Sequence, residues 1–117
     1  QSAQLGAAIR AQNVPVGAVI ASPFARCRDM AEIAFGRVEE RMELLGLLSD
    51  RNGRPERIAY LRSKLSEPTT NGNRIIVAHR SNIAEVAGVT LAEGDAVVVR
   101  PTGQGWERLA EFAPGDW

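Results

Sequence analysis

Two short apolar runs, each followed by a cluster of polar residues, constrain the fold more than any other feature of the chain. Residues 18–21 read Ala-Val-Ile-Ala, and residues 75–78 read Ile-Ile-Val-Ala. Uninterrupted apolar runs of this length are typical of strands that are buried on both faces, as in parallel sheets. The segment between the two runs is long enough for crossover helices, so we expect parallel strands covered by helices.

The rest of the chain shows mainly helical periodicity, with shorter strand-like segments. The expected helices cover residues 1–10, 22–35, 55–67 and 81–88. Ser22 is the expected N-cap of the second helix, with Pro23 as its first residue. The expected strands are residues 18–21, a strand within 42–48, 74–79, 96–99 and an edge strand at 106–112. The predicted fold class is α/β, a mostly parallel open sheet with helices on both faces in one domain over residues 1–117.

Composition excludes several classes of function. Fourteen basic residues balance fourteen acidic ones, so no net charge attracts the chain to nucleic acid or to an anionic membrane. No apolar run reaches the roughly 20 residues that span a bilayer. The single cysteine, Cys27, excludes an internal disulfide and falls on the apolar stripe of its helix, which predicts a buried structural thiol. The chain has one histidine and no grouped ligands, so we expect neither a metal nor a cofactor.

Polar residues follow the strands at 18–21 and 74–79. Ligands of open parallel sheets bind beyond the carboxyl ends of the strands, so both clusters are expected on one rim. Free amides at the helix that starts at Ser22 form an anion site, and Arg26, about one turn later, adds a guanidinium that matches phosphate oxygens. His79 ends its strand, where an imidazole can donate to a phosphoryl oxygen or transfer a proton. The alternatives are a solvated Arg26 and a His79 bonded to nearby backbone.

Two motifs in these clusters resemble those of the histidine phosphatase superfamily, also called phosphoglycerate mutase-like. Residues 22–31, SPFARCRDMA, are similar to the family's SPLxRAxxTA signature. Residues 77–83, VAHRSNI, followed five residues later by a glycine, are similar to its VxHGxxI…xG motif. Residues 1–10 also resemble the family's first helix, and the end of the chain, from Leu91 to Trp117, resembles the tail of its small bacterial members.

The resemblance implies a phosphatase that hydrolyses a phosphomonoester or a protein phosphohistidine through a phosphohistidine intermediate. It implies that Arg26 and His79 are catalytic, because they would stabilise charge on the transferring phosphoryl group. Ser22 and Arg80 would bind the substrate with them, although Arg80 stands where the family usually has glycine. The implied partner is a phosphorylated small molecule or a phosphoprotein. Glu43, Asp50 and Glu85 are alternatives for the general acid, and the compartment, cytoplasmic or periplasmic, stays open.

The family's nucleophile is the histidine of an Arg-His-Gly motif at the end of its first strand, and this sequence contains no such motif. We therefore expect that histidine upstream of Gln1; the alternative is a non-catalytic phosphate-binding or interaction module. The family's first strand lies between the strands that are here 19–21 and 75–78. Without it we expect two unpaired strand edges and a gap of about 10 Å. Such a chain is not expected to be a stable monomer by itself. The alternatives are that it is a fragment of a longer polypeptide, that a segment upstream of Gln1 supplies the strand, or that something else fills the gap, such as a second copy or an exchanged strand.

Overall fold

The structure is a computed structural model that describes residues 2–48, 51–70, 72–92 and 95–113. In chain order the elements are α1 (Ser2–Ala11), β1 (Val16–Ala21), α2 (Ala25–Phe35), β2 (Glu39–Glu40), the 3₁₀ helix η1 (Met42–Leu44), α3 (Arg54–Ser66), β3 (Asn73–Val77), α4 (Arg80–Ala87), β4 (Ala96–Pro101) and β5 (Trp106–Phe112). The helices and strands expected from the sequence are confirmed within the described residues, with three exceptions: the strand within 42–48, the start of the second helix, and the end of the strand at 74–79, which stops at Val77 and leaves His79 as the N-cap of α4.

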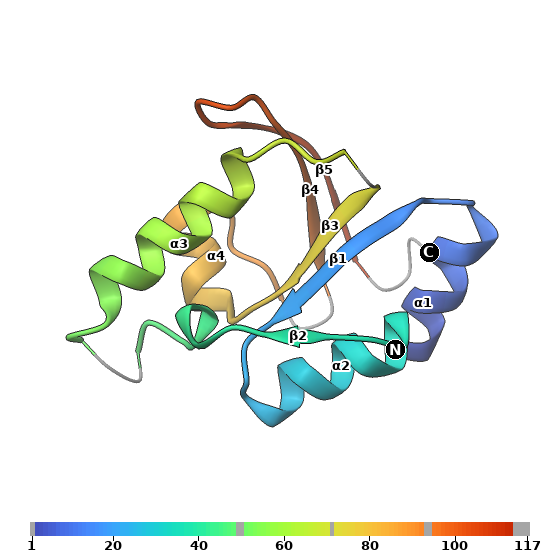
Figure 1. The fold of residues 1–117 in the computed structure, drawn as a ribbon, viewed down its shortest axis with the longest axis horizontal. Coiled ribbons are helices and arrows are strands. Elements are labelled where there is room, and N and C mark those ends of the chain that lie inside the picture. The colour runs from blue at the N-terminus through green and yellow to red at the C-terminus, as the bar shows by residue number, and fades with distance from the viewer. Residues whose placement is uncertain (1, 49–50, 71, 93–94, 114–117) are drawn as a thin grey trace.

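A three-stranded parallel sheet, in the order β2-β1-β3, forms the centre of the molecule. Side chains of β1 alternate between its faces, as they must in a strand. Val19 and Ala21 form a buried cluster with Ala31 of α2, whereas Ile20 packs on the other face in a cluster that includes Leu61 of α3. Accordingly, α1 and α2 lie on one side of the sheet and α3 and α4 on the other (Figure 1). The expectation of an α/β fold with helices on both faces of a parallel sheet is confirmed.

The expected gap between the strands at 19–21 and 75–78 is wrong. β1 and β3 are neighbours in the sheet, with Val19 opposite Ile75 and Ala21 opposite Val77. The backbone N–H of Ser22 extends this pairing, because it donates to the carbonyl of Val77 at 3.1 Å. Buried backbone groups without partners are costly, and direct pairing of the two apolar strands satisfies them. The two edges that were expected to face a gap therefore bond to each other.

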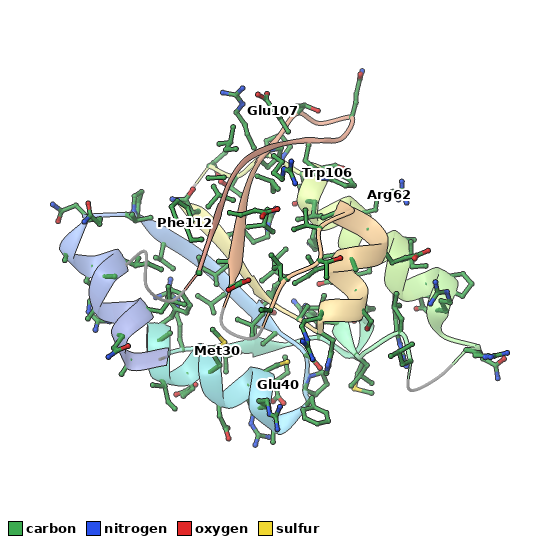
Figure 2. The ribbon with its side chains drawn as sticks, turned by 180° about the vertical axis from the view of Figure 1, so that it is seen from behind. Met30, Glu40, Arg62, Trp106, Glu107 and Phe112 are labelled. Atoms are coloured by element: carbon green, nitrogen blue, oxygen red, sulfur yellow. The ribbon has the colours of Figure 1, made fainter. Side chains whose placement is uncertain are left out.

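The strand at 96–99 does not join the parallel sheet. β4 pairs with β5 in a separate two-stranded antiparallel sheet. The connection is short and contains Gly103 at φ 87°, which closes a local hairpin. Trp106 begins β5 and packs against the buried cluster that contains Ile20 and Leu61, and it lies toward α3 in Figure 2. A nearby antiparallel partner thus replaces the longer-range parallel pairing that the sequence suggested.

The strand expected within 42–48 is also wrong. This segment contains η1 and a turn, and its own residues Leu44 and Leu47 are buried. A short apolar run indicates that a segment is buried, but it does not distinguish a strand from a buried irregular segment. The backbone of the segment at 42–48 is bonded by a side chain of α4, which belongs to the site described below.

The helix expected over 22–35 begins later, at Ala25, and Ser22 is not its N-cap. Phe24 holds the N-cap position without a side-chain cap. Ser22 instead stays with the sheet through its bond to Val77, and its side chain is fully buried. The expected helix end is confirmed, because Gly36 forms the C-cap at φ 74°.

Gly6 allows α1 to approach α2 closely. A Cβ added to Gly6 would lie 2.0 Å from the carbonyl oxygen of Ala34, so one helix would have to move. We expect Gly6→Ala to lower the free energy of unfolding by about 2 kcal/mol, despite the better helix propensity of alanine. Chemical denaturation measures this loss. Gly105→Ala is the control, because a Cβ there meets nothing within 4 Å; equal stability of the two variants would contradict the close contact.

Candidate functional site

His79 lies just beyond the carboxyl end of β3, next to Ser22 just beyond the end of β1. The Oγ atom of Ser22 is 3.0 Å from Nε2 of His79. The backbone N–H of Phe24 donates to the same Oγ at 3.2 Å, so the hydroxyl proton can donate to Nε2 of a neutral imidazole. Direct pairing of β1 with β3 brings these strand ends side by side. The expectation that both clusters share one rim is confirmed for Ser22 and His79.

The surroundings of His79 favour its neutral form. Burial lowers the pKa of His79 below its ordinary value of 6.5, and the positive charge of Arg57 lowers it further. Arg57 comes from the first turns of α3 and donates through Nη1 to the carbonyl of Gly46 at 2.9 Å. Gly46 lies against the imidazole, since a Cβ there would be 3.3 Å from Cγ of His79. Arg57, Gly46 and His79 therefore lie close together.

A cavity of about 610 Å³ opens beside this group. That volume lies within the range of small-molecule sites in proteins. Its lining includes Phe24, Leu45, Gly46, His79, Arg80 and Leu91. None of the described residues that line it carries a carboxylate. An arginine and an imidazole thus face a space of ligand size with no lining acid to repel an anion.

Asn82 holds the segment between η1 and α3 against the site, and sequence reasoning gave it no role. Its side chain is 1 % exposed. Its Oδ1 accepts the N–H of Leu47 at 3.2 Å, and its Nδ2 donates to the carbonyl of Leu45 at 3.0 Å. Ser81 adds a hydroxyl bond to Oδ1 at 3.1 Å. The buried side-chain amide of Asn82 therefore bonds backbone groups of Leu45 and Leu47 that a neighbouring strand would otherwise bond. Leu45 is part of one wall of the cavity.

Sequence reasoning gave no role to Asn82 or to Arg57, yet the spacing of both residues within their helices could have identified them. Asn82 is four residues before the buried Val86, and Arg57 is four residues before the buried Leu61. Residues four apart share a helix face, so each polar side chain interrupts an apolar stripe. A polar residue in such a position must find a bonding partner inside the fold.

The structure does not bring every expected site residue together. Ser22 and His79 are in contact and Arg80 lines the cavity, whereas Arg26 is exposed on the first turn of α2 and is not among the lining residues. The charge of Arg26 acts on the adjacent Cys27, whose pKa is nevertheless raised because burial outweighs it. Cys27 is buried on the inner face of α2, as expected for a structural thiol.

The carboxylates considered as general acids do not line the cavity where they are described. Glu85 forms an ion pair with Arg54, with Oε1 3.2 Å from Nη2. Glu43 is half-buried in η1. Asp50 lies outside the described residues. Neither Glu43 nor Glu85 therefore takes up the position of a proton donor to a ligand in this cavity.

Comparison with known proteins gives no relative: no protein-family model, no curated protein and no solved structure matches the chain. Within the described residues, no group of three or more histidine, cysteine or acidic side chains is placed to hold a metal ion. The helices in this part of the chain are too short or too polar to cross a bilayer.

Proposed function

We propose that the chain binds the phosphoryl group of a phosphorylated ligand in the cavity beside His79. The observation that carries the proposal is the position of the imidazole: it lies at the carboxyl end of β3, bonded to Ser22, near the charge of Arg57, and it lines a cavity of ligand size. Ligands of parallel sheets gather at such strand ends. Arginine and histidine are side chains that recognise phosphate oxygens.

The electrostatics of the cavity support an anionic ligand. Arg80 lines the cavity and Arg57 is close enough to act on His79. The charge of Arg57 disfavours a positive charge on the imidazole when the cavity holds no anion. A phosphate dianion would reverse this balance, because an opposite charge nearby favours the charged imidazole. Binding of an anion is therefore expected to raise the pKa of His79, and the imidazole is expected to take up a proton as the anion binds.

The activity proposed for this binding site is phosphate hydrolysis of the histidine phosphatase type, as the two motifs imply. In that chemistry a histidine attacks phosphorus and displaces the alcohol, and water then releases phosphate from the phosphohistidine. His79 corresponds to the second histidine of the motifs and would stabilise the phosphoryl oxygens. The proposal therefore requires a nucleophilic histidine outside the printed sequence, whereas binding of the anion does not.

A second candidate is a phosphate-binding module without hydrolytic activity. The observation that favours it is the direct pairing of β1 with β3. The resemblance places the strand that carries the nucleophile between these two strands, and here their backbone groups bond to each other. A chain that keeps this pairing binds the phosphoryl group but holds no nucleophile at the position that the family uses.

Calorimetry with phosphate and with vanadate, together with an aryl phosphate hydrolysis assay, tests both candidates. We expect saturable binding of phosphate that weakens at least about tenfold in His79→Ala, because an oxyanion partner is lost. Ile33→Ala, an exposed change on α2 that does not line the cavity, is the control. Binding with turnover supports the phosphatase, and binding without turnover supports the module. Absence of binding, or equal binding by His79→Ala, would overturn the proposal.

A further inference from the structure

The cavity extends well past the atoms that a phosphoryl group needs, and its remaining wall is apolar. Beyond His79, Arg80 and two hydroxyl-bearing residues, the described lining is made of carbon-rich side chains and one glycine. The apolar members are Phe24, Leu45, Leu48, Ala84 and Leu91. They come from the turn before α2, the segment after η1, α4 and the segment that follows α4. Separate parts of the chain therefore converge to build this wall.

Phe24 places an aromatic ring directly beside the imidazole. The ring centroids of Phe24 and His79 are 5.4 Å apart and the planes meet at 85°, an edge-to-face contact. Phe24 is nevertheless 54 % exposed, so much of its surface has no partner within the described chain. A group attached to a phosphoryl oxygen at His79 would lie against this exposed ring surface. Contact with the ring would remove apolar area of both partners from water.

We propose that the cavity selects phosphomonoesters whose ester group is apolar, such as an aryl group, over those whose ester group is a polyol or sugar. This inference rests on the proposed function, because His79 and the arginines must hold the phosphoryl group. A polyol placed against Phe24, Leu45 and Leu91 would find no hydrogen-bonding side chain among these three residues, which disfavours its binding relative to an aryl group. An aryl group has no hydroxyl groups to satisfy.

Calorimetry with inorganic phosphate, phenyl phosphate and glycerol 3-phosphate tests the selectivity. We expect phenyl phosphate to bind about fivefold or more tightly than glycerol 3-phosphate. Phe24→Ala is expected to remove most of that advantage, measured as the ratio of the two ester affinities, so that any effect of the ring on phosphate binding through His79 cancels. Ile33→Ala is the matched control, since Ile33 is 59 % exposed on α2, the helix that follows Phe24, and does not line the cavity. Leu48→Ser, at an exposed position of the wall, provides a second variant that needs no repacking of the core.

The outcomes separate this inference from the function on which it rests. Equal affinity for the two esters, with inorganic phosphate still bound, would overturn the selectivity and leave phosphate binding intact. An unchanged preference in both Phe24→Ala and Leu48→Ser would also overturn it, because the apolar wall would then play no part. Failure of all three ligands to bind would overturn the proposed function together with the selectivity.

Discussion

Asn82→Ala is expected to lower the free energy of unfolding by about 3 kcal/mol. The substitution leaves the N–H of Leu47 and the carbonyl of Leu45 without the side chain that bonds them. Asn82 is almost fully buried, so water does not reach its position to replace these bonds. Each buried polar group left unsatisfied costs about 1–3 kcal/mol, and the lost side chain adds a small cavity.

Urea denaturation of wild type and variant measures this effect, and Asn73→Ala is a matched control. Asn73 is also an asparagine that bonds a backbone carbonyl, that of Pro15 at 2.9 Å, but it is exposed. Its loss is expected to remain below about 1 kcal/mol because water replaces the bond. The Asn82 variant is also expected to bind phosphate more weakly, since Leu45 and Gly46 form a wall of the cavity. Equal losses of stability in the two variants would contradict the structural role assigned to Asn82.

Arg57→Gln is expected to weaken phosphate binding about tenfold, whereas Arg26→Gln is expected to leave it unchanged. The reason is position: neither arginine is among the residues that line the cavity, but the charge of Arg57 acts on His79, whereas Arg26 is exposed and its charge acts on Cys27. Loss of a positive charge close to a bound phosphate is expected to cost about a factor of ten in affinity. The two substitutions are chemically identical, so each is the control for the other.

The pKa of His79 distinguishes an electrostatic effect of Arg57 from general damage to the fold. The positive charge of Arg57 lowers this pKa, so its removal is expected to raise it. Arg57→Lys keeps the positive charge, so the pKa of His79 is expected to stay low although the hydrogen bond from Arg57 to the carbonyl of Gly46 is lost. A loss of binding in Arg26→Gln that equals the loss in Arg57→Gln would restore Arg26 as the phosphate-binding arginine and contradict the site described here.

Periodicity predicted most of the elements because their packing is local or follows one clear pattern. β1 and β3 each contain a short uninterrupted apolar run, and the helices carry apolar stripes that cover these strands. Gly36 and Gly88 end two of the helices in the left-handed conformation. The proximity of Ser22 and His79 followed from the same reasoning, because both lie just beyond the carboxyl ends of parallel strands. Sequence alone therefore predicted that the segments containing Ser22 and His79 lie close together.

Strand partners and the details of the site depended on contacts between distant residues. The direct pairing of β1 with β3 and the separate β4–β5 hairpin result from satisfying backbone groups, which no residue pattern encodes. Ser22 looked like a helix cap because a Ser-Pro pair has the same signature there, yet its hydroxyl bonds His79. Arg57 approaches His79 from 22 positions away in the sequence, so only the folded arrangement of α3 identifies it as the nearby charge.

Titration of His79 by NMR, with and without sulfate, tests the anion site most directly. His79 is the only histidine, so the imidazole signals need no assignment, and sulfate stays a dianion through the range in which histidine titrates. In the absence of sulfate the pKa is expected below 6.5, because burial and Arg57 disfavour the charged ring. Saturating sulfate is expected to raise the pKa, so that sulfate binds more tightly as the pH falls through this range. A titration curve that sulfate at matched ionic strength leaves unchanged would show that no anion binds beside His79.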